Sequence, residues 1–245
     1  MDERTPYANA RYGKEWDPTR HYQNADVATD YDRARFSSVA GRLFNFFDKR
    51  ALRRALVGLP PGSRIADVPC GTGRLAEVLL ESGFTVHGID ISSAMLDVAR
   101  ARLGHFGDRF TVEVSDIGAM TAGRRRFHAV LSARFLMHFP LAEQAAMIAA
   151  MAATADARLI LTQGITTPFQ RLRRAVKRRL GLFQNPAAFP VTNAEMAAML
   201  EAAGWREIRR HRVLPVLSEA TVIVAAPLKR SLSMTGSTAA MGSDR

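Results

Sequence analysis

The stretch Ile65-Ala-Asp-Val-Pro-Cys-Gly-Thr-Gly-Arg74 decides the fold, together with Gly88-Ile-Asp-Ile-Ser92 a short distance downstream. The first stretch begins as a short apolar strand and runs into a tight glycine turn. The second is a strand that ends on an acidic residue. Glycines in such a turn adopt positive φ and let a ligand approach the bare backbone. Together the two stretches predict the nucleotide-binding half of a doubly wound α/β sheet.

Apolar runs alternate with helical patterns on both sides of this pair, which predicts a seven-stranded, mostly parallel sheet. Strands are expected over residues 64–68, 85–90, 110–114, 127–132 and 158–162, and helices over 30–56, 75–82, 93–103, 141–153 and 193–203. Residues 205–214 and 221–226 then predict a final antiparallel pair. We expect one domain over residues 30–228, with a helical cap at its N-terminus. An irregular segment, 1–29, precedes it, and a disordered tail, 229–245, follows it.

The composition of the chain predicts the cellular compartment of the protein rather than its function. The chain has 245 residues and a single cysteine, Cys70, so we expect neither a disulfide framework nor a metal site built from thiolates. The polar start lacks the apolar core of a signal peptide, and no run of apolar residues is long enough to span a bilayer. These features predict a cytoplasmic protein. The net charge of +11 permits contact with nucleic acid, anionic lipid or an anionic small substrate.

Acidic residues at successive strand ends distinguish between two classes of adenosine cofactor. Asp90 is placed to accept hydrogen bonds from both hydroxyls of a ribose. Gly71-Thr-Gly73-Arg-Leu-Ala76 fits the dinucleotide fingerprint, but Asp67 beside it would repel a pyrophosphate and attract an ammonium group. Asp116 ends the next strand and is able to accept from an adenine amino group. The set favours S-adenosylmethionine (SAM), which carries an ammonium group and no phosphate.

The same segments resemble, in order and spacing, the motifs of class I SAM-dependent methyltransferases. The likeness rests on Asp67-Val-Pro-Cys-Gly71-Thr-Gly73, Gly88-Ile-Asp90-Ile-Ser92, Ser115-Asp116 and Phe127-His-Ala-Val-Leu-Ser132. It covers about residues 30–226 and is greatest for the small-molecule branch that includes ubiquinone- and menaquinone-type methyltransferases. Tyr31-Asp-Arg-Ala-Arg-Phe36 is similar to the short N-terminal motif of that branch. Pro69 stands where the family pattern has its first glycine, which puts the local shape of the loop in doubt.

The resemblance implies a role for each matching position. Asp67 and Gly71 would lie against the methionine part of SAM, with Gly73 completing the turn. Asp90 would hold the ribose, and Ile91 would pack on the adenine. Asp116 would accept from the adenine amino group, with Ser115 and Ile117 beside it. Ser132 and Ala133 would bring backbone near the methionine amine. Further cofactor contacts are expected from Tyr31, Arg35 and Arg134.

The segment after the 127–132 strand is expected to face both cofactor and acceptor. His138 is either a base for a hydroxyl or amine acceptor or a packing residue at the start of the next helix. Arg134 either holds a carboxylate of the cofactor or acceptor or is a solvated charge. The Asn/Asp-Pro-Pro-aromatic pattern of enzymes that methylate amino groups of bases is replaced by Ser132-Ala-Arg-Phe135.

A basic amphipathic helix is predicted within residues 166–181, where the charged positions run from Arg171 to Arg179. Three interpretations remain open: contact with an anionic membrane surface, a grip on an anionic acceptor, or a lid helix with a solvated face.

The sequence therefore predicts methyl transfer from SAM to a small-molecule or lipid-like acceptor, on oxygen, nitrogen or carbon. An RNA methyltransferase is the first alternative, and a non-catalytic SAM-binding regulatory protein is the second. An NAD-dependent oxidoreductase is disfavoured by Asp67 and Asp116.

Overall fold

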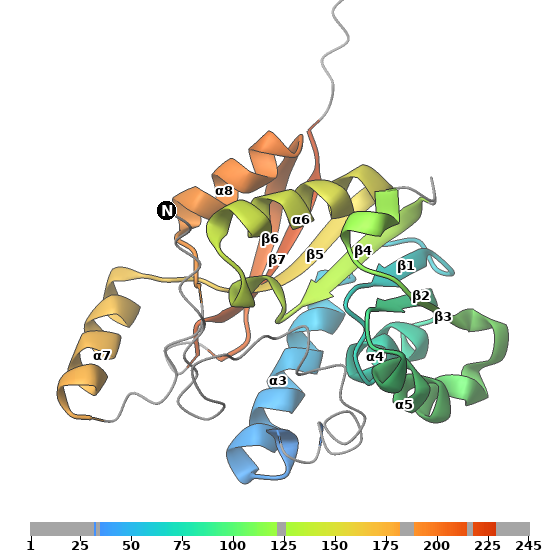
Figure 1. Ribbon diagram of the computed structural model, residues 1–245, viewed down its shortest axis with the longest axis horizontal. Coiled ribbons are helices and arrows are strands. Elements are labelled where there is room, and N and C mark those ends of the chain that lie inside the picture. Colours follow the sequence, from blue (N-terminus) through green and yellow to red (C-terminus); the bar gives the residue numbers. More distant parts are fainter. Residues whose placement is uncertain (1–31, 33–34, 122–125, 182–188, 215–217, 229–245) are drawn as a thin grey trace, which may run out of the picture.

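The computed structural model describes residues 32, 35–121, 126–181, 189–214 and 218–228. These residues form a seven-stranded sheet in the order β3-β2-β1-β4-β5-β7-β6 (Figure 1). The strands are β1 Arg64–Asp67, β2 Thr85–Asp90, β3 Phe110–Val114, β4 Phe127–Ala133, β5 Ala155–Gly164, β6 Trp205–Arg212 and β7 Ala220–Pro227. Strand β7 runs antiparallel to both of its neighbours, β5 and β6, and the other neighbouring pairs are parallel. The predicted fold class is thus confirmed, and so is the final antiparallel pair.

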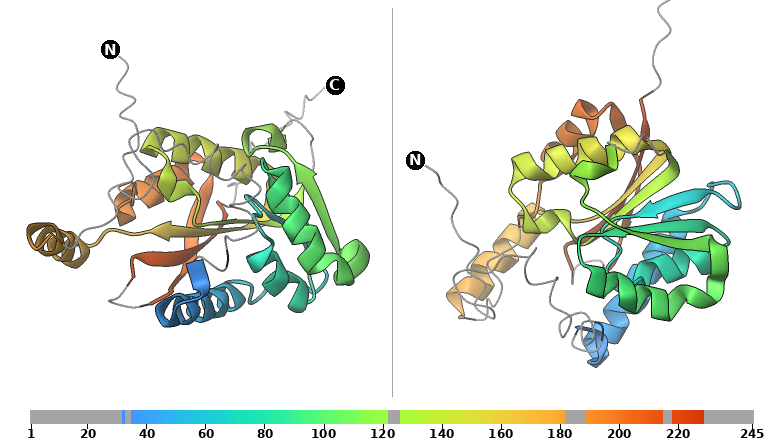
Figure 2. Two further views of the ribbon diagram at one scale, coloured as in Figure 1. Left: turned by 60° about the horizontal axis from the view of Figure 1, so that its bottom comes forward. Right: turned by 45° about the vertical axis from the view of Figure 1, so that its right-hand side comes forward.

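Helices cover both faces of the sheet, as Figures 1 and 2 show. One face carries α3 Val39–Ala55, α4 Arg74–Glu81 and α5 Ser93–Leu103. The other face carries α6 Leu141–Thr154 and α8 Asn193–Ala202. Three short 3₁₀ segments, η1 Gly104–Arg109, η2 Gly118–Thr121 and η3 Leu136–His138, lie in the connections. The remaining helix, α7 Pro168–Arg179, stands away from the sheet in every view.

Two hydrophobic cores hold the three layers together. On one side of the sheet, Leu52 of α3 and Leu79 of α4 pack over Ile65 of β1. On the other side, Ile148 of α6 and Leu200 of α8 pack over inward-facing residues of β4, β5 and β7. All five of these side chains are at most 2% exposed. Burial on both faces explains why the central strands are almost continuously apolar.

Local signals in the sequence set several helix ends. Gly83 adopts a φ of 87° just past α4, which is the conformation a glycine supplies after a helix. The Ser92 hydroxyl accepts a hydrogen bond from Met95 N at the start of α5. Thr192 and Glu195 form a reciprocal capping box at the start of α8.

Most element boundaries differ from the sequence prediction by one or two residues, and two differ by more. The helix expected over residues 30–56 is interrupted at Ser37 and Ser38, because the Ser38 hydroxyl accepts from Gly41 N and starts α3 afresh at Val39. Strand β5 is longer than residues 158–162, since pairing with β7 continues as far as Gly164. The segments expected at 1–29 and 229–245 lie outside the described residues. None of the described helices is long and apolar enough to cross a membrane.

Candidate active site

The glycine loop between β1 and α4 has the tight shape that its sequence predicts. Gly71 and Gly73 both adopt positive φ, 55° and 76°. A Cβ on Gly73 would come within 2.7 Å of the Leu103 Cδ1 atom, so a larger residue there would displace the buried Leu103 side chain of α5. Cys70 N donates to the carbonyl of Ile89 at 2.8 Å and ties the loop to β2. Both positions therefore favour glycine for its backbone conformation, and Gly73 also for close packing.

Asp90, at the end of β2, organises the loop from the other side. Its Oδ2 atom accepts from Gly71 N at 2.8 Å, and its Oδ1 atom accepts from Ser92 N at 2.9 Å. The side chain is 5% exposed. Burial raises the pKa of Asp90, while the hydrogen bonds from Ser92 and Gly71 lower it. The carboxylate is held in one orientation and still has lone pairs for a ligand.

Asp67, at the end of β1, is buried, and its carboxylate is only partly hydrogen-bonded. Its side chain is 1% exposed, and its Oδ2 atom has no hydrogen-bond partner among the described residues. Burial raises the pKa of Asp67 well above its usual value, the nearby Arg74 opposes that shift, and the charge on Asp90 adds to it. A buried carboxylate oxygen without a donor costs free energy. A cationic donor bound in the cavity would remove that cost.

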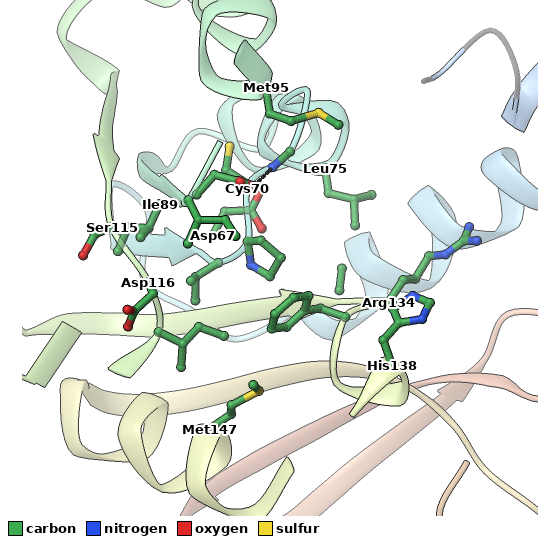
Figure 3. Close-up of a pocket in the computed structure, with 18 of the residues that line it drawn as sticks. Asp67, Cys70, Leu75, Ile89, Met95, Ser115, Asp116, Arg134, His138 and Met147 are labelled. Atoms are coloured by element: carbon green, nitrogen blue, oxygen red, sulfur yellow. Dashed lines mark hydrogen bonds between the residues drawn. The ribbon is translucent and has the colours of Figure 1, made fainter. Parts of the chain in front are cut away.

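Asp67 and Asp90 both line one cavity of about 590 Å³. This volume is within the range of about 300–1,000 Å³ typical of small-ligand pockets. It opens where β1, β2 and β4 end, and Figure 3 shows Asp67 and Asp116 on its wall. The predicted site residues that line it are Asp67, Gly71, Asp90, Ile91, Ser115, Asp116, Ile117, Ala133, Arg134 and His138. The fold thus brings together residues from four separate segments of the chain.

Three predicted residues are placed differently, and a fourth is not described. Gly73 and Ser132 do not line the cavity: Gly73 caps α4, and Ser132 is buried in β4 with no partner for its hydroxyl among the described residues. Arg35 is not in the lining either, but its charge acts on His138. Tyr31 lies outside the described residues. The cofactor-binding roles given to these four residues stay predictions.

One end of the cavity suits an adenine ring. Asp116 Oδ1 accepts from Ala119 N at 2.8 Å, which fixes the carboxylate at the start of η2. Ile89 and Ile117 add apolar wall on the β2 and β3 side, and Met147 approaches from α6 (Figure 3). Sequence reasoning missed this contribution of α6, which also includes Glu143, Ala146 and Ala150. Their spacing places them on one face of a helix, but it does not say which face meets the cavity.

The other end of the cavity is aromatic and cationic. Arg134 adopts a φ of 58°, a conformation that is uncommon for a residue with a side chain. Its guanidinium lies over the rings of Phe44 and Phe36, at 4.7 and 6.0 Å from their centroids. Phe36, which precedes α3, also lines the cavity. These stacked rings orient the Arg134 cation at the end of β4.

His138 stands beside Arg134 in the same wall (Figure 3). Burial and the charges of Arg35 and Arg134 lower its pKa to about 4. The imidazole is therefore neutral at physiological pH. A neutral imidazole is the form that a proton acceptor requires, so the geometry is consistent with either interpretation of His138.

His138 makes protein stability depend on pH. Between pH 6.5 and about 4 the unfolded chain takes up a proton at this residue and the folded chain does not. The unfolding free energy should therefore fall as pH drops through this window, by roughly 3 kcal/mol in full. We expect H138N to lose this component. Urea unfolding of both proteins from pH 7.5 to 4 measures it, and identical pH profiles would contradict the assignment.

The residues present fit SAM. The unpartnered Oδ2 atom of Asp67 matches the ammonium of its methionine part, and the fixed carboxylate of Asp90 matches the ribose hydroxyls. A pyrophosphate would meet the same two buried carboxylates and be repelled. The cations beside the loop already have partners, because Arg74 pairs with Asp48 at 2.7 Å and Arg102 donates to the carbonyl of Thr72 at 3.1 Å.

Comparison with known proteins gives the same answer. A family described as "Methyltransferase domain" matches residues 65–156. The chain is 31% identical over 135 residues to the magnesium-protoporphyrin O-methyltransferase of Synechocystis sp., which is 52% of this chain and 54% of that one. It is 32% identical over 79 residues to a ubiquinone biosynthesis O-methyltransferase of Coxiella burnetii, 32% of this chain and 34% of that one. The chain thus spans about half, or less, of the length of these curated relatives.

Solved structures share the fold over most of the chain. The crystal structure of magnesium protoporphyrin IX methyltransferase from Synechocystis with bound SAH superposes with a TM-score of 0.69 at 21% identity. The match covers 85% of this chain and 97% of that one. At this level of identity the likeness concerns the fold.

Proposed function

We propose that this chain, whose residues 65–156 match a family described as a methyltransferase domain, transfers a methyl group from SAM to a small-molecule or lipid-like acceptor. The observation that carries the proposal is the buried Asp67 oxygen without a donor, on the wall of a cavity that also holds Asp90 and Asp116. We also propose that the protein is cytoplasmic.

Each part of the cofactor has residues in the cavity to hold it. Asp67 and Gly71 would hold the amino-acid part, and Asp90 the ribose. Ile91 and Asp116 would hold the adenine, with Ser115 and Ile117 beside it. When bound, SAM supplies a methyl group on a sulfonium centre, which is an electrophile without any need for a metal.

The main contribution of the protein to catalysis is to position the acceptor relative to the cofactor. Methyl transfer is an in-line displacement, so the acceptor atom must be held close to the methyl carbon and aligned with it. Phe36, Phe135 and Phe139 give the acceptor end of the cavity apolar walls that exclude water. His138 would take the proton of a hydroxyl or amine acceptor, for which its neutral imidazole is ready.

An oxygen acceptor is favoured among the three atoms considered. The two curated relatives named above are both described as O-methyltransferases, one for magnesium-protoporphyrin and one in ubiquinone biosynthesis. Both names point to small organic acceptors with large apolar parts. The aromatic walls of the acceptor end suit a molecule of that kind.

Radiolabelled methyl transfer tests this function. The purified protein is incubated with methyl-labelled SAM and a cell extract, and the products are separated into organic-extractable, water-soluble, RNA and protein fractions. We expect label in the organic-extractable fraction, and its loss with D90A. Label confined to RNA or protein, or label in no fraction, would contradict the proposal.

A further inference from the structure

Helix α7 exposes an apolar stripe that nothing in the described structure covers. Phe169, Leu172, Val176 and Leu180, just past its end, are 55%, 65%, 49% and 64% exposed. Their spacing places them along one side of a helix. Figures 1 and 2 show α7 standing away from the sheet, and Phe169 at its start lines a second cavity with residues of β6 and β7. None of the described α7 residues lines the cavity, so α7 does not act as a lid in this structure.

The sequence of α7 is strongly basic. Residues 168–180 contain no acidic residue, and their basic residues are Arg171, Arg173, Arg174, Lys177, Arg178 and Arg179. The whole chain carries a net charge of +11. A helix that combines exposed aliphatic side chains with this charge is suited to the boundary between anionic headgroups and acyl chains.

A second apolar stripe lies on the first half of α3. Val39, Leu43 and Phe46 recur at helical spacing and are 73%, 48% and 58% exposed. Phe36, three residues before Val39, lines the cavity. Helix α7 follows the carboxyl end of β5, at the same edge of the sheet where the cavity opens. Both helices project from that end of the molecule (Figures 1 and 2).

We propose that the exposed stripes of α7 and α3 form one docking surface for an anionic lipid bilayer, which seats the mouth of the cavity on the membrane. Transfer of exposed apolar side chains from water into an apolar phase lowers the free energy. A bilayer supplies such a phase, and an RNA does not. A second copy of the chain is disfavoured, because two α7 helices would bring twelve like charges together. Charge and hydrophobicity thus select the same occupant.

This inference deepens the proposed function, since a lipid-like acceptor would then enter the cavity directly from the bilayer. Its test, however, measures vesicle binding without turnover. A protein that binds vesicles and transfers no methyl group would contradict the proposed function alone, and the reverse result would contradict only the docking surface.

Vesicle sedimentation of the full chain tests the surface. Vesicles of phosphatidylcholine alone are compared with vesicles that also contain phosphatidylglycerol. We expect binding to the mixed vesicles that weakens as salt is raised, because surface charges are then screened. L172E/V176E should bind more than about tenfold less, and V39E several-fold less, since each change puts a carboxylate into the proposed contact.

V57E is the matched control. Val57 is 60% exposed but lies past the other end of α3, away from the cavity. This variant carries the same kind of change and should bind like the unaltered protein. All four positions are exposed, so the variants should fold. Three results would overturn the inference: no binding to either vesicle, equal binding by L172E/V176E, or a dimer that L172E/V176E converts to a monomer.

Discussion

D90A should bind S-adenosylhomocysteine more than about tenfold more weakly than the unaltered protein. A hydrogen bond to a charged group contributes about 1.5–3 kcal/mol, and each 1.4 kcal/mol is a factor of about ten in affinity. Asp90 would accept two such bonds from the ribose. It also accepts from Gly71 N and Ser92 N, so its loss loosens the loop that contacts the cofactor. Isothermal titration calorimetry measures the effect directly.

D97A is a suitable control for the same titration. Asp97 is a carboxylate on α5 close to Asp90 in sequence, but its side chain is 69% exposed and pairs with Arg100 on the surface. Its removal should leave the affinity for S-adenosylhomocysteine unchanged. Thermal unfolding of D90A, followed by circular dichroism, shows whether the variant is folded. A folded D90A with full affinity would contradict the assignment of the ribose site.

D67N should have the largest effect of any single conservative change. The substitution keeps the shape of the side chain and removes its charge, so an ammonium group loses a buried, charge-assisted partner. Truncating one partner of such a buried pair costs about 2–5 kcal/mol in binding. We expect S-adenosylhomocysteine to bind roughly a hundredfold more weakly.

The unfolding free energy of D67N should equal or exceed that of the unaltered protein. In the ligand-free protein Asp67 is buried with one oxygen unpartnered, and burial raises its pKa well above the usual value. Replacing a group of this kind removes a cost from the folded state. D67N should therefore unfold at the same urea concentration as the unaltered protein or a higher one. A strongly destabilised D67N would show that Asp67 is structural.

The sequence was most informative where one local rule decides the structure. Alternation of apolar runs and helical patterns predicted the order of the elements, and Gly83, Ser92 and Thr192 set helix ends through their own chemistry. The break at Ser37 and Ser38 was missed, because the apolar spacing continues across it and only the hydroxyl cap of Ser38 interrupts the helix.

In the candidate site, too, some residues could be predicted from the sequence and others could not. Asp67, Asp90 and Asp116 follow strands directly, so the topology of a parallel sheet brings them to one edge. Met147 comes from a helix whose orientation depends on packing across the sheet, and Phe36 comes from the segment before α3. The pairing of Arg134 with two aromatic rings depends on its positive φ, which no sequence pattern announces for an arginine.

The central claim is that the Asp67 carboxylate binds the ammonium group in the amino-acid part of an adenosine cofactor. One calorimetric comparison tests it most directly: the unaltered protein and D67N, each titrated with S-adenosylhomocysteine and with methylthioadenosine, which has the same adenosine but no amino-acid part. We predict that D67N weakens S-adenosylhomocysteine binding roughly a hundredfold and leaves methylthioadenosine binding unchanged. Equal weakening of both ligands, or no weakening of either, would contradict the claim.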